Sequence, residues 1–543
     1  MTGAFDVAVL GSGFGGSLAA LLARRAGRSV VLIEKGSHPR FAIGESSSPL
    51  ANLLLEELAD RYDLPRIRPL SAWGPWQRTY PEIGGGLKRG FTFYAHEAGK
   101  PFRGAPDRSD QLLVAASPCD EVADTHWYRP DFDQFLAREA AAEGAEYLDR
   151  TAITGVAGGA SGLEIEAERE GRPLRLRARF VIDASGPGGA LHRAFGLESV
   201  AFPDLPRTEG LFTHFENVRR LDAMGIFSAA ETPPYPADEA ALHHVFDGGW
   251  IWVLRFGNGL TSAGVAAAPA LARQLRLSEG APAWGRLLDR LPTVRDQFAG
   301  ARPTLPFVHR PRLPFRSRTA AGPGWALLPS AAAFVDPLLS TGFPLTLLGL
   351  ERLADAMRTD WGRPAFEEKL RRHEARTFLE VDAAALLVSA LYARFHDFPV
   401  FASLTTLYFA AASFAESARR LGRPAMAGSF LSADHPTFGP AFTSCCRMAL
   451  TGAPENRRDL LAAIRRTIEP LDVIGLSDAS RRNWYPVDAA DLLSGAHKLR
   501  ATPDELRELL QRSGVFPPPP RPGAGNIQTD THGSCFGQDK LVS

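Results

Sequence analysis

Three glycines near the start of the chain have the spacing that lets a backbone loop hold a phosphate group. Gly11, Gly13 and Gly16 follow an apolar run at 5–10 and lead into a helical pattern at 17–25. The first glycine permits a tight turn, the second lets a pyrophosphate approach the backbone, and the third lets the helix pack on the strand. The helix N-terminus supplies N–H donors and a positive dipole, so we expect Phe14 and Gly15 to contact the ligand as well.

A carboxylate stands where such a loop needs one. A second buried strand at 29–33 ends at Glu34, about 20 residues past the glycines, where an acidic side chain accepts the ribose hydroxyls. We assign the adjacent Lys35 to the same cofactor site. Together these residues predict a dinucleotide-binding Rossmann unit at the N-terminus, but they do not separate NAD from FAD.

Four later segments carry a resemblance to a known family. In order they are IGESSSP at 43–49, WYRPDFDQFL at 127–136, FVIDASG at 180–186 and FVDPLLSTG at 334–342. Over roughly residues 1–360 they resemble flavin-dependent halogenases and their relatives among FAD monooxygenases and geranylgeranyl reductases. The resemblance implies that the cofactor is FAD.

For the first two segments, the family implies contacts with the cofactor, but a purely structural role is also possible for their residues. Ile43 and Ser46 would border the flavin, although serines here equally suit a turn that caps a helix from Pro49. Arg129 would reach the phosphate or ribityl part of the cofactor. The alternative for Arg129 is a helix-start arginine paired with a nearby aspartate, Asp131 or Asp133.

The last segment carries the halide expectation. Asp336 closes a turn before a helix at 345–357, whose N-terminus would direct N–H groups at the flavin or at an anion. The resemblance implies that Thr341 and Gly342 hold chloride or bromide. Many FAD hydroxylases have a Gly-Asp pair just upstream, where this chain has Pro329 and Ser330.

Lys88 is the candidate catalytic residue, and Phe93 follows it on the same predicted strand unit. In the family a lysine at this place holds hypohalous acid, or is converted to a haloamine, and presents the halogen to the substrate. A buried ammonium with a lowered pKa suits that task. The alternative is a solvated hairpin lysine beside Arg89.

Two tryptophans resemble part of a halogenase signature. Trp250, Trp252 and Leu254 alternate along one strand and so share one side of it, either as a wall beside the flavin or as an ordinary sheet core. His244, in the pair His243-His244 just before, is a candidate hydrogen-bond partner for a substrate phenol.

The resemblance implies a reaction in which reduced FAD, oxygen and halide give hypohalous acid, which halogenates an electron-rich aromatic substrate, free or carrier-bound. The glycine-rich stretch at 155–162 lacks a strand-to-helix context, so we expect a separate flavin reductase as partner. Two alternatives remain: a monooxygenase, reductase or desaturase of the same fold without halogenation, and a non-catalytic flavin-binding protein.

The elements that must position these residues predict an α/β protein. We expect a three-layer, mainly parallel Rossmann-type FAD domain at 1–360, with an inserted antiparallel substrate-domain sheet from segments at about 70–115 and 200–300. Helical periodicity at 366–377, 381–395, 404–421 and 457–468 predicts a C-terminal helical cap at 361–515. The prolines at 517–520 predict a spacer and tail over 516–543.

Composition agrees with an ordinary globular protein. Lys plus Arg and Asp plus Glu both total 61, which gives no reason to expect nucleic acid. The four cysteines lack the spacing of a metal or redox site, so we expect no metal and a reducing cytoplasm. The uncharged run at 398–415 contains too many hydroxyls for a good membrane span and predicts a buried helix.

Overall fold

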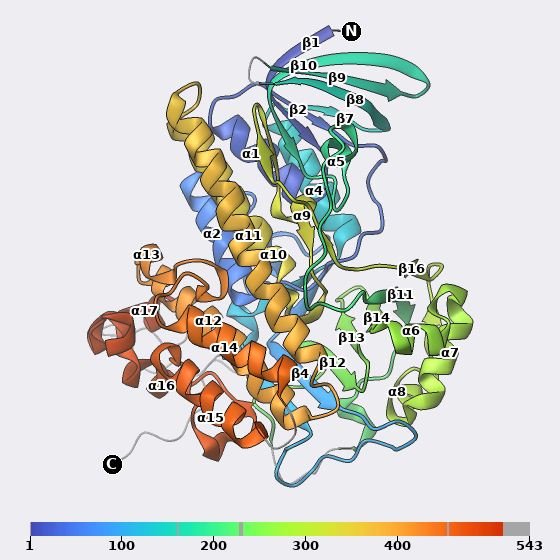
Figure 1. The fold of residues 1–543 in the computed structure, drawn as a ribbon, viewed down its shortest axis with the longest axis vertical. Helices are drawn as coiled ribbons and strands as arrows, with labels where there is room; N and C mark the ends of the chain where they lie inside the picture. The colour runs from blue at the N-terminus through green and yellow to red at the C-terminus, as the bar shows by residue number, and fades with distance from the viewer. Residues whose placement is uncertain (1, 160–161, 227–231, 453–455, 514–543) are drawn as a thin grey trace, which may run out of the picture.

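The computed structural model describes residues 2–159, 162–226, 232–452 and 456–513. Its first sheet has parallel strands at the centre and lies at the end of the molecule that carries the N-terminus (Figure 1). In order, its strands are β18 (Ala321–Gly322), β19 (Trp325–Leu327), β10 (Arg172–Asp183), β1 (Thr2–Leu10), β2 (Val30–Ile33) and β7 (Glu146–Leu148), with β9 (Gly162–Arg169) and β8 (Thr151–Gly159) continuing from β10.

The central strands are buried on both sides of the sheet. Their sequences are therefore continuous apolar runs and do not alternate between apolar and polar residues. Val7 and Val9 of β1 pack with helices α1 (Phe14–Arg25) and α10 (Gly342–Thr359). The alternate residues Ala8 and Leu10 pack with Leu163 of β9 in a separate core. The expected three-layer, mainly parallel arrangement is therefore confirmed, with the β8–β9 hairpin contributing the third layer.

A second sheet is built mainly from antiparallel strands of two distant segments. Its order is β15 (Arg302–Pro303), β11 (Glu209–Glu216), β14 (Thr261–Ala267), β13 (Gly249–Arg255), β12 (Ala241–Phe246), β4 (Gly90–Ala95), β5 (Gln111–Ala115) and β21 (Trp484–Tyr485), and β16 (Val308–Arg310) also pairs with β11. The two segments meet where β4 lies parallel to β12. The edge strand β21 comes from the C-terminal region and runs parallel to β5.

Short strands and small helices complete the fold. These are β3 (Gly85–Lys88) with β6 (Asp124–Trp127), β17 (Phe315–Arg316) with β20 (Ala333–Phe334), and the helices α3 (Trp73–Thr79), α5 (Ala190–Ala194), α6 (Pro269–Leu275), α7 (Ala281–Arg290), α8 (Pro292–Gln297) and α9 (Pro329–Ala332).

The remaining helices cover the sheets and form the C-terminal region, which lies at the lower left of Figure 1. They are α2 (Pro49–Arg61), α4 (Arg129–Ala142), α11 (Pro364–Tyr392), α12 (Phe398–Arg420), α13 (Pro424–Ala427), α14 (Phe438–Thr451), α15 (Arg457–Ile468), α16 (Ala489–Ser494) and α17 (Pro503–Arg512). The helical character expected at 361–515 is confirmed over its described part.

The expectation of two helices at 366–377 and 381–395 is wrong, because α11 runs through both as one helix. The apolar pattern is interrupted at Leu379, which is exposed, and at Glu380, which is buried. Arg352 of α10 donates to both carboxylate oxygens of Glu380, at 3.2 and 3.0 Å. This pairing lets a charged residue occupy a core position without ending the helix.

Helix α12 is long and apolar enough to cross a membrane by composition, but 78% of its apolar stretch is buried within the protein. It is thus a core helix, as the sequence predicts.

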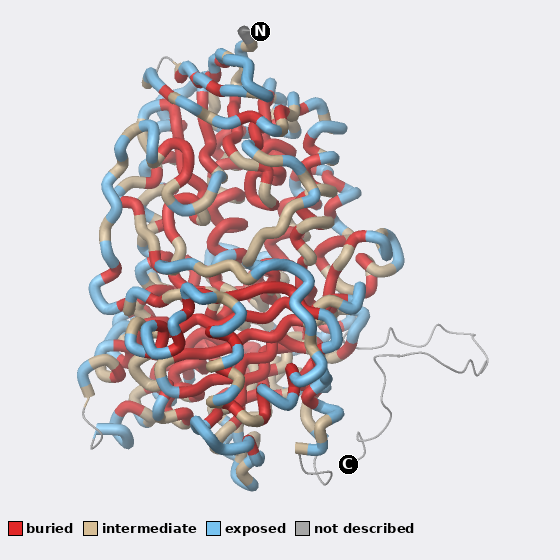
Figure 2. The backbone as a smooth tube through the Cα atoms, turned by 90° about the vertical axis from the view of Figure 1, so that its right-hand side faces the viewer, coloured by how far each residue is buried: buried red, intermediate tan, exposed pale blue. Residues whose placement is uncertain are grey.

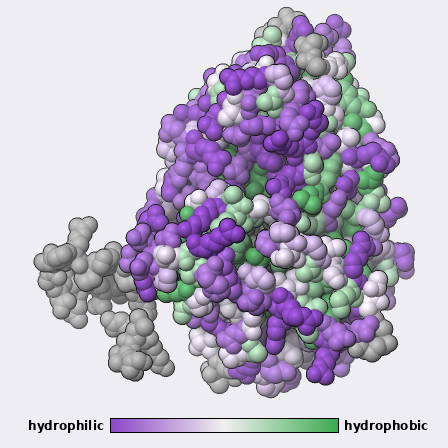
Figure 3. Space-filling view, turned by 60° about the vertical axis from the view of Figure 1, so that its left-hand side comes forward, coloured by the Kyte–Doolittle hydropathy of each residue, from purple (hydrophilic) through white to green (hydrophobic). Residues whose placement is uncertain are grey.

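Buried backbone runs through both sheets and the helices between them (Figure 2). The face in Figure 3 is mostly hydrophilic, with apolar side chains in small groups. The domain boundaries stay a prediction, and the spacer and tail expected at 516–543 lie outside the described residues.

Candidate active site

The glycine turn joins β1 to α1 and leaves no room for side chains. Gly11 has φ +97°, and a Cβ on Gly16 would lie 1.8 Å from the Gly11 carbonyl oxygen. Helix α1 begins at Phe14, three residues earlier than its sequence pattern indicates, with Gly13 as its N-cap. The free N–H groups of its first turn therefore belong to the glycine loop itself, as binding of a pyrophosphate requires.

Two arginines lie beside this turn. A Cβ on Gly13 would be 3.5 Å from a guanidinium nitrogen of Arg129 and equally far from one of Arg40. Arg129 forms two charge-assisted hydrogen bonds with Asp133, at 2.7 and 2.8 Å, and donates to the Gly44 carbonyl at 2.8 Å. The ion pair that the sequence left as an alternative is thus present, and the same guanidinium lies on the wall of a cavity.

Glu34 fixes the other side of the turn. Its carboxylate accepts from the Ser12 N–H at 2.9 Å and the Gly36 N–H at 3.0 Å, and pairs with Arg40 at 3.4 Å. Burial would raise its pKa, but Arg40 and these donors outweigh burial and hold the pKa below the usual range. Lys35 is exposed and does not belong to the cavity lining, so the structure does not place it with the other cofactor-site candidates.

The segment after β2 contributes both a wall and a helix cap. Ile43, Glu45 and Ser46 line the cavity, while Ser48 accepts from the Ala51 N–H and caps α2. Glu45 Oε1 pairs with His214 at 2.7 Å, and its other oxygen is buried without a hydrogen-bond partner among the described residues. This oxygen is therefore available to accept a hydrogen bond from a group bound in the cavity.

Asp336 lies at the centre of a buried hydrogen-bond network. It accepts from Trp250 Nε1 at 3.2 Å, the Tyr392 hydroxyl at 3.0 Å, the Thr208 hydroxyl at 3.3 Å and the Leu338 N–H at 3.1 Å. Burial raises the pKa of Asp336 to about 6, although these four donors favour its ionised form.

The loop after Asp336 is conformationally strained where it meets α10. Leu339 and Ser340 have φ of +65° and +53°, a region that side-chain-bearing residues rarely adopt. The loop delivers Thr341 as the N-cap and Gly342 as the first residue of α10, three residues before the helix start that the sequence indicates. Both residues line the cavity at the positive end of the helix dipole, which suits an anion.

The tryptophan strand faces the same cavity. Trp250, Trp252 and Leu254 of β13 all line it, as expected for alternate residues of one strand. His243 of β12 lines it too, stacked on Phe93 with ring centroids 4.3 Å apart. Burial lowers the pKa of His243 to about 3, so its ring is neutral near pH 7.

The assignment of His244 to the substrate side is wrong. His244 follows His243 on the strand and therefore points to the opposite side of the sheet. There it pairs with His96 at 2.8 Å and with Gln297 at 2.9 Å, in a buried polar cluster. The residue that sequence reasoning missed is His243, because strand alternation separates the two histidines but does not say which one meets the cavity.

Lys88 is completely buried, so the solvated hairpin alternative is wrong. Its ammonium donates to the Ser46 hydroxyl at 2.9 Å and to the Ser47 carbonyl, and lies 3.7 Å from the centroid of the Phe91 ring. Burial lowers its pKa, and the nearby Asp124 carboxyl opposes that effect only in part. A larger share of the amine is therefore uncharged and nucleophilic near neutral pH than for an exposed lysine.

Lys88 lies between wall residues of two cavities. The first, of about 340 Å³, we call the glycine-loop cavity; its lining includes Gly13, Arg129, Ser46, His243, Trp250 and Thr341. The second, of about 690 Å³, we call the aromatic cavity; its lining includes Asn52, Phe91, Asp124, Tyr408, Phe409 and Leu510. Because Ser46 lines the first and Phe91 the second, Lys88 contacts a wall residue of each.

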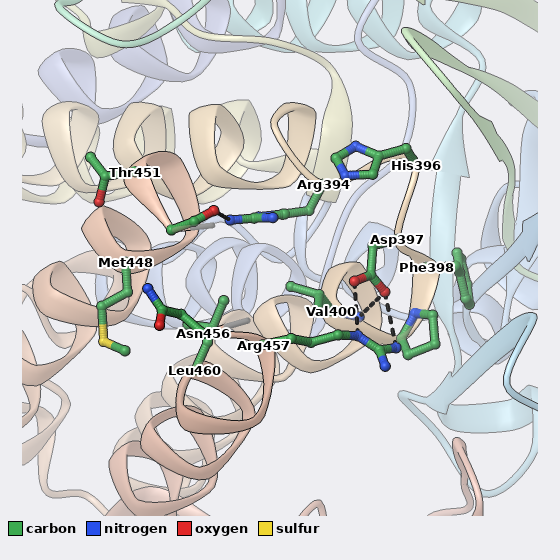
Figure 4. A pocket seen from close by; sticks show the side chains of 12 residues that line it. Arg394, His396, Asp397, Phe398, Val400, Met448, Thr451, Asn456, Arg457 and Leu460 are labelled. Atoms are coloured by element: carbon green, nitrogen blue, oxygen red, sulfur yellow. Dashed lines mark hydrogen bonds and ion pairs between the residues drawn. The ribbon is translucent and has the colours of Figure 1, made fainter. Parts of the chain in front are cut away.

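A third cavity, of about 570 Å³, lies between α12 and α15, and its charges already have protein partners (Figure 4). Arg457 pairs with Asp397 at 2.9 Å, and Arg394 donates to the carbonyls of Ala449 and Gly452 at 2.8 and 2.7 Å. Because these two guanidinium groups already bind protein groups, they have few donors left for a ligand. We therefore do not assign this third cavity to the reaction.

The residues of the glycine-loop cavity fit FAD. The side-chain-free turn at Gly11 and Gly16 and the first turn of α1 suit a pyrophosphate, and the unpaired oxygen of Glu45 suits an N–H donor on a ring system. Pro329 and Ser330, which replace the Gly-Asp pair of many hydroxylases, also line the cavity. Arg40 is a wall residue that no sequence motif had singled out.

Comparison with known proteins gives a consistent result. The family model for FAD dependent oxidoreductases matches residues 6–200. The chain is 31% identical to the monodechloroaminopyrrolnitrin halogenase PrnC of Pseudomonas fluorescens, over 73% of this chain and 69% of that protein. It is 28% identical to the tetracycline 7-halogenase of Kitasatospora aureofaciens, over 66% of this chain and slightly under two thirds, 64%, of that protein. The crystal structure of halogenase PltM in complex with phloroglucinol and FAD superimposes with a TM-score of 0.77 at 25% identity, covering 88% of this chain and 99% of that one.

Proposed function

This chain belongs to the flavin-dependent halogenases, and from that premise we propose that it halogenates a small aromatic substrate in the aromatic cavity, using a halogen delivered by Lys88. The observation that carries the proposal is the position of Lys88. Its buried ammonium contacts one wall residue of the glycine-loop cavity and one of the aromatic cavity. A reactive oxidant formed in the first would reach the second through this amine.

In the glycine-loop cavity, we propose that the first turn of α1 binds the cofactor pyrophosphate, with Arg40 and Arg129 adding positive charge. When bound in its reduced form, FAD would supply two electrons that reduce oxygen to the oxidation level of peroxide, and oxygen at that level would oxidise chloride or bromide to hypohalous acid. Thr341 and Gly342 would hold the halide at the N-terminus of α10.

Lys88 would then control the oxidant. As an ammonium it can donate a hydrogen bond to hypohalous acid; as a neutral amine it can exchange N–H for N–X with release of water. Its burial serves both routes, because burial excludes water and lowers the amine pKa. Ser46 and Ser47 hold the amine in place through their hydroxyl and carbonyl oxygens.

We further propose that the electrons come from a separate flavin reductase. The second glycine-rich stretch of the sequence supports this, because Gly158 lies in β8 and Gly162 in β9, neighbouring strands of an antiparallel ladder that lacks the strand-to-helix turn of a nucleotide site. A cytoplasmic location also remains a proposal: the buried free thiols of Cys445 and Cys446 agree with a reducing compartment, whereas the disulfide bond of Cys119 does not.

The test is bromination of resorcinol by the full chain with FAD, a flavin reductase, NADH, oxygen and bromide. Lys88→Met keeps most of the side-chain volume but removes the amine, so we expect bromoresorcinol formation to fall at least about 100-fold while FAD binding persists. Lys100→Met, at an exposed position, is the matched control. Hydroxylated product without bromination would instead support the monooxygenase alternative.

A further inference from the structure

Asp124 is the residue directly opposite Lys88 in the antiparallel β3–β6 ladder. Directly opposed residues project to the same side of a sheet, with Cβ atoms about 5 Å apart. The Asp124 carboxyl is buried, with a residue exposure of 6%, and lines the aromatic cavity. None of the ion pairs among the described residues joins it to Lys88, whose ammonium is directed to Ser46 and Ser47.

The hydrogen bonds of Asp124 are incomplete. Oδ1 accepts from the Asn52 amide at 3.3 Å, and Oδ2 is buried without a partner among the described residues. An unpaired buried acceptor is costly, and a carboxylate oxygen more so than a neutral one. This oxygen therefore requires a donor, and the cavity that it lines is where a donor can enter.

The part of the cavity wall that has aromatic rings favours a flat molecule that carries one such donor, while charged side chains such as Glu416 and Arg420 line other parts of the same cavity. The rings of Phe91, Tyr408 and Phe409 line the same cavity. Among charged groups, Lys88 and Arg420 favour the ionised carboxylate, whereas Glu416 and burial favour the neutral acid. Burial has the largest effect and raises the pKa of Asp124, which makes the carboxylate a stronger base.

We propose that Asp124 binds the ring-attached O–H or N–H of the aromatic substrate through its unpaired oxygen and accepts that proton during halogen transfer. The inference rests on the proposed function, because it names the substrate group that this halogenation requires. A ring held by Asp124 presents its neighbouring carbons toward Lys88, since the two residues occupy one rung of the ladder.

The step balances for a phenol and hypohalous acid. The ring carbon supplies the electron pair of the new C–X bond, and the X–O bond breaks with its pair leaving as hydroxide. The O–H proton moves to Asp124, and the ring proton then leaves with the hydroxide as water. Asp124 returns its proton to the phenolate oxygen, so the sum is ArH plus HOX giving ArX plus water.

Binding to the FAD-loaded full chain tests the assignment without turnover. Resorcinol and 1,3-dimethoxybenzene are both electron-rich, but only resorcinol has O–H groups. We expect isothermal titration calorimetry to give a Kd at least about tenfold lower for resorcinol, and Asp124→Asn to reduce the ratio of the two Kd values to about one. Asp120→Asn, four residues away and exposed, is the control that should keep the wild-type ratio.

A wild-type ratio of Kd values in Asp124→Asn would overturn the assignment. If that variant loses the near-ultraviolet circular dichroism of the native fold, the ratio of the two Kd values is measured in Asp124→Ser, which has a smaller polar group. The two proposals fail separately. Wild-type protein that never brominates resorcinol refutes the proposed function whatever the Kd ratio, whereas a ratio that ignores Asp124 refutes only this inference.

Discussion

The Tyr392 hydroxyl, near the end of α11, donates a hydrogen bond to Asp336 Oδ2 at 3.0 Å. Asp336 precedes the strained loop that carries Thr341 and Gly342 into α10. Tyr392 also accepts a hydrogen bond from Trp250 Nε1 at 3.2 Å, and Val381 of the same helix lines the glycine-loop cavity. The C-terminal helical region thus contributes to the wall of this cavity, and the start of the strained loop is held by a residue more than 50 positions away.

Removing that hydroxyl should weaken the fold at this point. Tyr392→Phe leaves the ring and removes one donor to a buried carboxyl, so we expect the free energy of unfolding to fall by about 1.5 kcal/mol. Urea unfolding followed by circular dichroism measures this change. Tyr80→Phe, whose ring packs on Phe135 away from the cavity, is the comparison. Equal stability losses in the two variants would contradict a special role for Tyr392.

Bromide binding should weaken as pH rises through about 6. The pKa of Asp336 is raised to about 6, so its carboxyl is neutral below that pH and negatively charged above it. A carboxylate on the same cavity wall as Thr341 and Gly342 repels a halide. We expect the KM for bromide to rise about fivefold between pH 5 and pH 7, and to stay level in Asp336→Asn. A KM that is flat in the wild type would remove Asp336 from halide binding.

The glycine turn should not tolerate even one methyl group. In Gly16→Ala the new Cβ would lie 1.8 Å from the Gly11 carbonyl oxygen, so the turn or the helix must move. We expect FAD affinity, measured by quenching of flavin fluorescence, to fall at least about tenfold. Gly285→Ala is the matched control, because no atom lies within 4 Å of its added Cβ. Full FAD affinity in Gly16→Ala would argue against this turn as the pyrophosphate site.

Neighbouring histidines should give opposite phenotypes. His243→Ala opens the wall of the glycine-loop cavity, and we expect kcat/KM for resorcinol bromination to fall about tenfold with a small change in stability. His244→Ala leaves His96 and Gln297 without a shared partner, and should lower the free energy of unfolding by about 2 kcal/mol. The reverse pattern, with bromination lost only in His244→Ala, would show that the histidine assignment is inverted.

The sequence predicted most of what local chemistry determines. The glycine turn, Glu34 and the shared side of Trp250 and Trp252 follow from spacing and strand or helix period, whereas the halide assignment of Thr341 and Gly342 rests on the family resemblance and stays a prediction. The family resemblance, together with the position of Lys88 on a predicted strand, also predicts that this lysine is buried.

What it could not predict depends on pairing between distant segments. The pairing of Lys88 with Asp124 depends on the register of β3 against β6, and no local sequence pattern specifies that register. The same limit applies to the choice between His243 and His244. The continuity of α11 through Glu380 depends on Arg352, which lies on a different helix.

The walls of the aromatic cavity come from nearly opposite ends of the described chain, since Leu50 and Leu510 both line it. The nucleotide-binding sheet can pair β1 with β10 once the first 183 residues exist, but the cavity beside Lys88 closes only after α17 has left the ribosome. During synthesis the glycine turn and its sheet can therefore form well before the aromatic cavity, which we propose as the substrate site, and Lys88 lies next to an unfinished wall until translation is almost complete.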